Sequence, residues 1–224
     1  MAPESRRAPH LLTQVLAEAF DGRFPPADAM AEVVAPSDDG AEAVLALTAH
    51  AFVATALRPE VVGAQRIDGL GRAVEPEFLL WLAGPGGYVG SHDVVLGRLA
   101  TGGHTALAAT ERFANHNRVR LARSRRQDVM VLDDPHGIVT LGRNPFGWLE
   151  LGVEVFPEKR LKGHGRRLIE QTLKVPPSGE PLFAHVAPGN AASLRAFLAA
   201  GFRPLGSIVM IRPTSGRLGQ GGAR

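Results

Sequence analysis

The chain has 224 residues, of which 45% are apolar and 21% are charged, and it contains no cysteine. This composition excludes a disordered protein and allows one large core, or one core with a small second lobe. The absence of cysteine excludes disulfides, thiolate catalysis and a cysteine-based metal site, and it fits a reducing compartment. Because the first residues, Met1–Pro9, are polar and show no signal peptide, we expect a cytoplasmic protein without a membrane partner.

Charge is distributed unevenly along the chain. Residues 1–100 hold seven Lys or Arg against 13 Asp or Glu, whereas residues 101–224 hold 18 against nine. This imbalance predicts an acidic lobe followed by a basic lobe that binds anions. A phosphate-bearing cofactor and a nucleic acid are the two candidate ligands of the basic half.

Helical patterns dominate the first hundred residues. Apolar residues at helical spacing predict a helix over residues 11–20, which Gly22 ends. The Ser37-Asp38-Asp39 cap is expected to start a long helix that runs to about Leu57. Further short helices are expected over residues 59–70, 76–83 and 105–115. We therefore expect residues 1–104 to form a mostly helical N-terminal lobe.

Strand patterns begin at about Arg118. The elements expected from there are strands over residues 128–132, 137–141 and 148–155, a helix over 163–174, a strand over 182–186, a helix over 191–200 and a strand over 208–212. A hairpin signal, Asp133–Gly137, separates the first two strands. The order predicts an α+β fold with a mixed sheet in residues 105–213, followed by a flexible tail over 214–224.

The most informative segment comes after the strand at residues 148–155. Phe156-Pro157 leads into an R-x-x-G-x-G motif, Arg160–Gly165, and then into a helix. A strand that breaks into glycines before a helix exposes backbone N–H groups at the helix N-terminus, where a phosphate or pyrophosphate can bind. The short motif is frequent by chance in a chain rich in Arg and Gly, so its specificity comes from the neighbouring elements. Another strand, Pro188-Gly189-Asn190, a helix and Gly201-Phe202 complete the segment.

Over about Asp128 to Pro213, this order of elements resembles the GNAT superfamily of acyl-CoA-dependent N-acyltransferases. The resemblance implies a mixed, splayed β-sheet flanked by helices, with acetyl-CoA or another acyl-CoA as co-substrate and no metal. It implies an acceptor that is a primary amine of a small molecule, a protein N-terminus or a lysine, and it allows a homodimer. The N-terminal lobe would then be a lid or would shape the acceptor pocket.

The resemblance also implies which residues bind the co-substrate. The N–H groups of residues 161–166 would hold the pyrophosphate, and the backbone of Val153–Val155 would hold the pantetheine arm. Asn190 matches an asparagine that touches the cofactor, and a plain helix N-cap explains it equally well. The residues expected at the acyl-CoA site are Val153, Glu154, Val155, Arg160, Leu161, Lys162, Gly163, His164, Gly165, Arg166, Asn190, Ser193 and Phe197.

Three side chains are candidate general bases. His185 lies in the strand before Asn190, where the resemblance places a carboxylate base in some members, and an imidazole can accept a proton from an attacking ammonium. Glu150 and Glu154 lie in the strand before the glycine motif. The usual base position in that strand falls on Leu149 or Leu151, so the two-residue period of a strand directs Glu150 to the other face. Both glutamates are then expected to face solvent.

One departure from the family concerns the general acid. Many GNAT enzymes have a tyrosine seven residues after the asparagine, where it protonates the departing thiolate. Here that position is Phe197, which has no hydroxyl. The only tyrosine of the chain, Tyr88, lies in the expected Gly84–Gly90 loop and is a substitute candidate.

Two alternative functions stay open. A non-catalytic acyl-CoA-binding sensor is favoured by Phe197 and by the missing carboxylate. A nucleic-acid-binding protein, the less favoured alternative, would use the basic run Arg118–Arg126, which a solvated strand edge also explains. The scattered histidines show no metal-ligand spacing, so no metal is expected.

Overall fold

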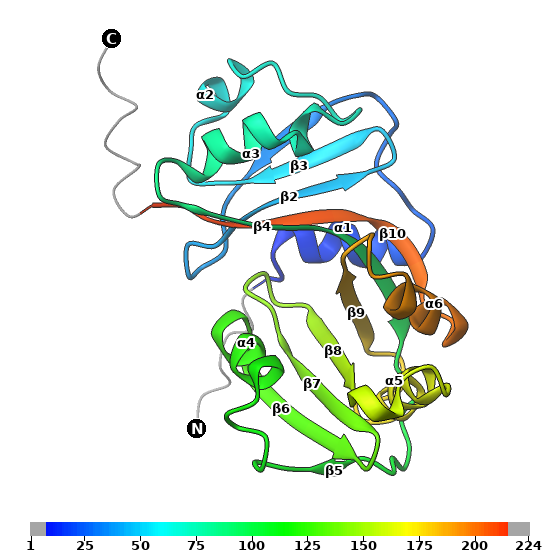
Figure 1. Ribbon diagram of the computed structural model, residues 1–224. Helices are drawn as coiled ribbons and strands as arrows, with labels where there is room; N and C mark the ends of the chain where they lie inside the picture. The colour runs from blue at the N-terminus through cyan, green and yellow to red at the C-terminus, as the bar shows by residue number, and fades with distance from the viewer. Residues whose placement is uncertain (1–7, 215–224) are drawn as a thin grey trace, which may run out of the picture.

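The computed structural model describes residues 8–214, which form one ten-stranded mixed sheet with helices on both faces (Figure 1). The strands are β1 (Ala31–Val34), β2 (Glu42–Leu47), β3 (His50–Ala54), β4 (Tyr88–Leu99), β5 (Ala108–Ala109), β6 (Gln127–Asp134), β7 (Gly137–Arg143), β8 (Leu149–Val155), β9 (Pro181–Val186) and β10 (Arg203–Arg212). The helices are α1 (Leu11–Phe20), α2 (Pro59–Gly63), α3 (Pro76–Ala83), α4 (Asn117–Arg125), α5 (His164–Thr172) and α6 (Ala191–Ala199), with 3₁₀ turns at Arg72–Val74 and Pro157–Lys159.

The sheet joins the two halves of the chain. Its order is β1-β3-β2-β10-β4-β9-β8-β7-β6-β5, so the last strand, β10, lies between β2 and β4 of the N-terminal half. It pairs antiparallel with both of them. In Figure 1, β1–β3 with α2 and α3 form the upper part, β4 and β10 cross the middle, and β5–β9 form the lower part.

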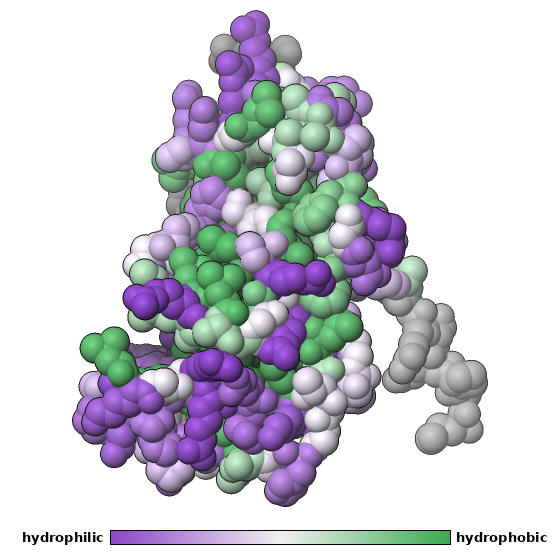
Figure 2. Space-filling view, turned by 90° about the vertical axis from the view of Figure 1, so that its right-hand side faces the viewer, coloured by the Kyte–Doolittle hydropathy of each residue, from purple (hydrophilic) through white to green (hydrophobic). Residues whose placement is uncertain are grey.

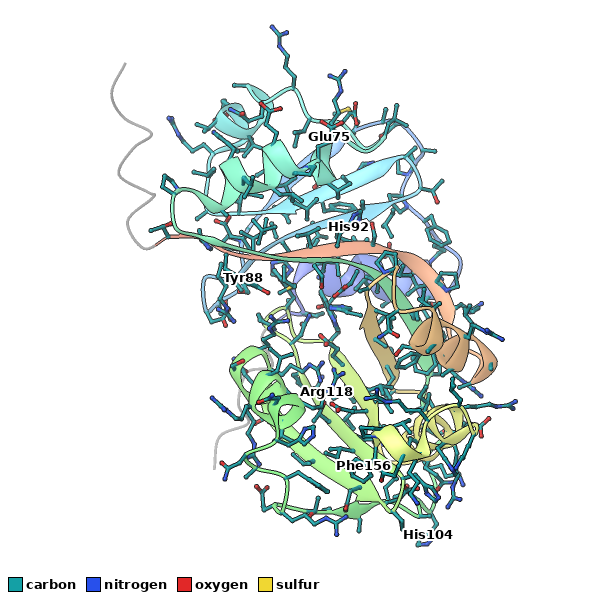
Figure 3. The ribbon with its side chains drawn as sticks, in the orientation of Figure 1. Glu75, Tyr88, His92, His104, Arg118 and Phe156 are labelled. Atoms are coloured by element: carbon teal, nitrogen blue, oxygen red, sulfur yellow. The ribbon has the colours of Figure 1, made fainter. Side chains whose placement is uncertain are left out.

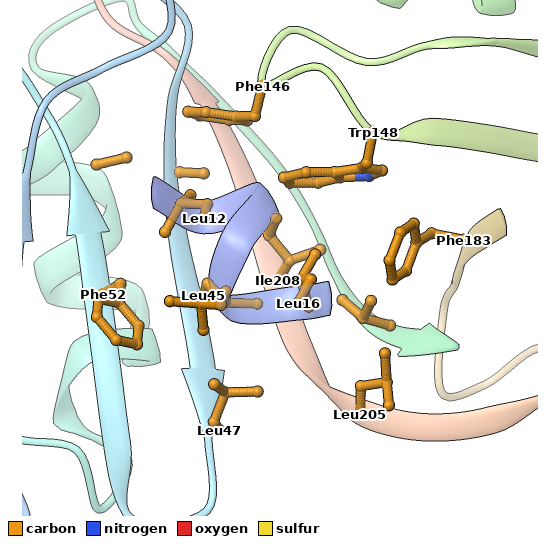
Figure 4. Packing of buried hydrophobic residues seen from close by; sticks show 14 of the residues in the cluster. Leu12, Leu16, Leu45, Leu47, Phe52, Phe146, Trp148, Phe183, Leu205 and Ile208 are labelled. Carbon is orange, nitrogen blue, oxygen red and sulfur yellow. The ribbon is translucent and has the colours of Figure 1, made fainter. Parts of the chain in front are cut away.

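One face of the sheet is covered by α1, whose apolar positions recur at helical spacing. His10 caps the helix, because its ring accepts a hydrogen bond from Leu12 N at 3.1 Å. Figure 4 shows Leu12 and Leu16 facing Leu45 and Ile208, with Trp148 beside them. Since Trp148 directly precedes β8, this core connects the N-terminal strands to the strand that carries Glu150.

The other face is covered by α5 and α6. Leu151 of β8 and Leu182 of β9 pack there against Ile169 of α5 and Phe197 of α6. The two neighbouring strands β8 and β9 are parallel but pair at only two positions, Leu149 with Leu182 and Glu150 with Phe183. Beyond these pairs the two strands diverge, and we call this divergence the fork.

Several sequence-based expectations are confirmed. The helices over 11–20 and 76–83, the hairpin between β6 and β7, and the order of elements from residue 128 onward all occur. The fold is α+β with a mixed, splayed sheet flanked by helices, as expected. The division into units at residues 104 and 105 stays a prediction, and residues 215–224 of the expected tail lie outside the described residues.

The expectation of a mostly helical N-terminal lobe is wrong. The long helix expected from Ser37 to Leu57 is the antiparallel pair β2–β3, in which Ala49 adopts a positive φ of 51° at the turn. Nearly every residue of both strands is buried. A strand covered on both faces shows no alternation, so its apolar run cannot be told from a buried helix by periodicity. The alanines in this segment have a high helix propensity, but this propensity is weak compared with tertiary packing.

The region before β6 is also different from the expectation. No helix forms over residues 105–115, and the basic run forms α4 instead of a strand edge. His116 caps α4 by accepting a hydrogen bond from Arg118 N at 3.2 Å. Only Val119 and Ala122 of this helix are buried, and the arginines around them hide the short apolar face in the sequence.

Truncating the core side of α1 should destabilise the whole sheet. Leu16 is fully buried, so Leu16→Ala is expected to lower the free energy of unfolding by about 2–5 kcal/mol. Leu11 of the same helix is 38% exposed, so Leu11→Ala should change it by no more than about 0.5 kcal/mol. Urea denaturation of both variants checks this, and equal losses would contradict the packing of α1.

Candidate active site

The loop between β8 and α5 presents unpaired backbone donors. Among the described residues, no hydrogen bond is formed by the N–H groups of residues 161–166, and the first helical bond is from Arg167 N to Gly163 O. Leu161 and Gly163 have positive φ angles of 60° and 78°. This alternation turns consecutive N–H groups to one side, which creates an anion-binding concavity at the N-terminus of α5. The predicted phosphate cradle therefore has the required backbone geometry.

Basic side chains surround this loop. Lys162, Arg166 and Arg167 are exposed, and Arg166 forms an ion pair with Glu170 at 2.7 Å. Arg160 turns back and donates from Nε to Val155 O at 3.2 Å. α5 lies on the side of the molecule that Figure 2 presents, where hydrophilic residues gather over the lower part of the surface. The loop thus combines free donors with positive charge.

His164, the first residue of α5, contributes its backbone rather than a charge. Its ring stacks on His136 at 3.8 Å between centroids. Partial removal from water lowers the pKa of His164 below its ordinary value, and the neighbouring His136 lowers it further. The neutral ring therefore packs beside the loop at pH 7. Leu161, by contrast, is almost completely exposed and is free to contact a ligand.

The free edge of β8 belongs to the expected pantetheine residues. Phe156 N donates to His136 O, on the β7 side. Because backbone groups alternate along a strand, Val153 and Val155 direct their N–H and C=O groups to the opposite edge, toward the fork. β9 does not pair with them there, although the Val155 carbonyl accepts the hydrogen bond from Arg160 Nε. A linear ligand with amide groups can bind to this edge as an extra strand.

A cavity of about 290 Å³ passes through the fork. Val186, Asn190, Ser193 and Phe197 line it on the side of α6. Arg118, Arg125 and Arg126 of the α4 segment line the other side, together with Tyr88, Asp93, Thr140, Glu150 and His185. Figure 3 shows Tyr88 on β4 and Arg118 on α4 flanking this region. The cavity therefore reaches both faces of the sheet through the gap between β8 and β9.

Glu150 lines the cavity and is buried, so the expectation that it faces solvent is wrong. Its side chain accepts a hydrogen bond from Arg126, and Oε2 lies 3.5 Å from His185 Nδ1. Burial by itself would raise the pKa of Glu150, but His185 and then Arg126 outweigh it and hold the pKa below its ordinary value. The strand period did direct Glu150 away from the α5–α6 face. The opposite face is covered by α1 and α4, so the side chain is buried there.

His185 is positioned as a base would be. Its side chain is 8% exposed, and Nδ1 faces the Glu150 carboxylate. Nε2 is buried and has no hydrogen-bond partner among the described residues. A carboxylate on Nδ1 favours the tautomer with the proton on that nitrogen, which leaves the Nε2 lone pair free.

The other predicted residues lie in different places. Glu154 pairs with Arg118 at 3.4 Å and does not line the cavity. Asn190 is the N-cap of α6 and accepts from Ser193 N at 3.2 Å, and it lines the cavity as well. Phe197 is buried against Phe202, and its ring forms part of the wall. Tyr88 begins β4 instead of lying in a loop, and its OH accepts from Arg125 at 2.8 Å.

Two cavity residues were missed in the sequence. Arg126 comes directly after α4 and binds Glu150 and Thr140, but in the sequence it is one of five arginines in a basic run. Asp93 lies on β4, far from the glycine motif in the sequence. No spacing links either residue to the glycine motif. The pairing of β4 with β9 reveals the position of Asp93, and the contact with Glu150 of β8 reveals that of Arg126.

No protein-family model matches the chain, and no curated protein matches it. Three similar solved structures are a GNAT-family acetyltransferase from Colwellia psychrerythraea (12% identity, TM-score 0.38), a GNAT-family protein from Novosphingobium aromaticivorans (18%, 0.38) and a GCN5-related N-acetyltransferase from Kribbella flavida (15%, 0.36). The matches cover 57%, 58% and 59% of this chain and 57%, 69% and 62% of those chains, respectively. Their descriptions name the superfamily that residues 128–213 resemble, but a likeness of this size does not by itself assign a function.

Within residues 8–214, no helix is long and apolar enough to cross a membrane. In the same range, no group of three or more His, Asp or Glu side chains is arranged to hold a metal ion.

Removing the Glu150 charge should destabilise the protein in a pH-dependent way. Glu150→Gln leaves Arg126 with no anionic partner, and breaking a buried pair costs about 3–5 kcal/mol at pH 7. Because the folded-state pKa of Glu150 is lowered, its contribution is present above the ordinary value of 4.5 and is lost as the pH falls through the folded pKa. The variant and the wild type should therefore converge in acid.

Denaturation of both proteins between pH 7 and pH 3 measures this. Glu170→Gln is the matched control, since its pair with Arg166 is exposed and is worth no more than about 1 kcal/mol. A Glu150→Gln protein as stable as the control at pH 7 would contradict the network.

Proposed function

We propose that this protein is a GNAT-type acyltransferase, which transfers an acetyl or other short acyl group from acyl-CoA to a primary amine. The observation that carries the proposal is the cavity through the fork. On one face, the cavity is lined by residues of α6, and α5, which follows the 161–166 loop, packs on that same face. On the other, the cavity opens toward Glu150 and His185. This arrangement fits an acyl thioester that enters from the loop side and an acceptor that enters from the α4 side.

The residues of the chain fit the co-substrate. The N–H groups of residues 161–166 would bind the pyrophosphate, helped by Lys162 and Arg167. The free edge at Val153 and Val155 would pair with the pantetheine amides. Such contacts need the backbone conformation rather than particular side chains, apart from the glycine in the left-handed region at 163. Small molecules, a protein N-terminus or a lysine remain the acceptor classes.

In the proposed mechanism, His185 Nε2 takes a proton from the acceptor ammonium. The freed lone pair of the amine nitrogen forms a C–N bond with the thioester carbonyl carbon. Backbone N–H groups at Val153 or Val155 stabilise the oxyanion, and the C–S bond then breaks with its electron pair leaving on sulfur. The attacking nitrogen, positively charged after the C–N bond forms, gives its second proton to the thiolate, and the proton on His185 passes to solvent. Glu150 orients the imidazole and stabilises its protonated form.

The general acid is not Phe197, which has no proton to donate. Tyr88 lines the cavity, and its OH acts as the acceptor in the bond from Arg125, so its own proton is not used there. A thiolate leaves without prior protonation more readily than an alkoxide, so transfer does not depend on this acid.

The nucleic-acid alternative is weakened by the pairing of α4. Arg118, Arg123 and Arg126 each form an ion pair with a carboxylate of this chain. The basic run is therefore largely neutralised within the protein, whereas non-specific nucleic-acid binding needs arginines that are available to phosphates. A sensor would need the same acyl-CoA site as the enzyme. It would differ only in that no acyl group is transferred.

Thermal melting with acetyl-CoA tests the binding half of the proposal. A ligand at one hundred times its dissociation constant adds about 2.7 kcal/mol to stability, which is an easily measured shift. Gly163→Glu should lose the shift, since it places a carboxylate at the cradle. Gly179→Glu is the matched control, because Gly179 also has a positive φ and open space but lies in the connection between α5 and β9. No shift in the wild type with acetyl-CoA or longer acyl-CoAs would overturn the proposal.

Turnover separates an enzyme from a sensor. His185→Gln should lower kcat by about 10²- to 10⁴-fold, the usual loss when a general base is removed, and should keep the acetyl-CoA melting shift. His92→Gln is the control, because His92 lies exposed on β4, bonds Ser207 and does not line the cavity. Release of free CoA thiol in the presence of amines measures both. A wild type that binds acetyl-CoA but turns over no amine is a sensor.

A further inference from the structure

One carboxylate of the cavity has no partner. Asp93 lines the cavity from β4, and its Oδ1 is buried without a hydrogen bond among the described residues. No ion pair or side-chain hydrogen bond of Asp93 occurs in that part of the chain. A buried carboxylate oxygen without a donor is unfavourable, and such an atom in a cavity wall points to a ligand that supplies the donor.

Asp93 lies on the same face of the sheet as His185. Val95 is directly opposite His185 in the β4–β9 ladder, and Asp93 is two residues before Val95 on the same strand. Residues two apart on a strand share a face, and diagonal neighbours of adjacent strands lie about 7–8 Å apart. This spacing leaves room for one small charged group between the Asp93 carboxylate and His185 Nε2, which is also buried and unpaired.

The nearby cations are all engaged elsewhere. Arg126 binds Glu150 and Thr140, Arg118 binds Glu154, and Arg125 donates to the OH of Tyr88. Arg212, at the end of β10, lies 3.8 Å from Asp39. The chain thus brings cations to the cavity but gives none of them to Asp93. The donor that Asp93 lacks can therefore come from a bound ligand, and a cationic group suits a carboxylate best.

We propose that Asp93 binds the ammonium group of the acceptor and presents it to His185. The inference rests on the proposed function and adds an acceptor-binding residue to it. The acceptor enters as a protonated amine, which the carboxylate attracts, and it loses one proton to Nε2 before its nitrogen attacks. The site selects amines that are cationic at neutral pH over alcohols and over weakly basic aromatic amines, since neither carries the charge.

The test is a comparison of kinetic constants. Release of CoA thiol is measured with acetyl-CoA and a panel of benzylamine, cadaverine and L-lysine amide, with benzyl alcohol and aniline as uncharged probes. For the best amine, Asp93→Asn should raise KM by about 10- to 100-fold, because one charge-assisted contact is lost. It should change kcat and the KM of acetyl-CoA by less than about threefold. Asp93→Glu, which restores the charge, should recover part of the loss.

Asp128→Asn is the control for loss of one negative charge, because Asp128 is exposed on β6 and does not line the cavity. Equal amine KM values in the wild type and Asp93→Asn would overturn the assignment of Asp93 and leave the transferase intact. Turnover of benzyl alcohol or aniline comparable to that of the amines would also overturn it. The assignment would also be overturned if the protein bound acetyl-CoA but neither turned over any amine of the panel nor showed a melting shift with those amines. A wild type that shows no acetyl-CoA melting shift removes the proposed function and this inference together.

Discussion

The candidate site depends on the divergence of two parallel strands. β8 and β9 share two residue pairs and then separate, although both lie in the middle of the sheet. They can do so because each is held from its outer side, β8 by seven pairs with β7 and β9 by six pairs with β4. The divergence leaves backbone groups of β8 without a strand partner. These groups are half-buried and lie along the fork, so this edge is where a ligand with amide groups can pair.

The polar groups at the fork form a balanced arrangement. Glu150 lies between Arg126, whose guanidinium compensates its negative charge, and Nδ1 of His185. The compensation lets a carboxylate stay ionised where burial alone would favour the protonated form. The imidazole gains a fixed orientation from the same contact. Asp93, on β4 beside β9, has no cationic partner among the described residues. In our proposal, Glu150 therefore supports His185, whereas Asp93 binds the ligand.

The N-terminal half acts as a scaffold for this site and not as a separate helical lid. β2 pairs with β10, β10 pairs with β4, and β4 carries both Tyr88 and Asp93. α1 packs under the same strands and against Trp148, the residue before β8. The acidic half therefore contributes a carboxylate to the acceptor side of the cavity, while the basic half contributes the cradle on the other face.

The sequence by itself determined the loop to which the proposed co-substrate site is assigned. The order from Phe156 through Gly163 to Asn190 is local, and the free N–H groups of a loop before a helix result from the backbone conformation that its glycines allow. It also singled out His185. Tertiary structure alone decided that residues 42–54 are strands, because burial on both faces removes the alternation by which a strand is recognised. It alone decided that Glu150 is buried and that Arg126 and Asp93 join His185, because these contacts connect α4, β4, β8 and β9, which are far apart in the chain. Sequence periodicity reports which face a side chain takes, but only the packed structure decides what covers that face.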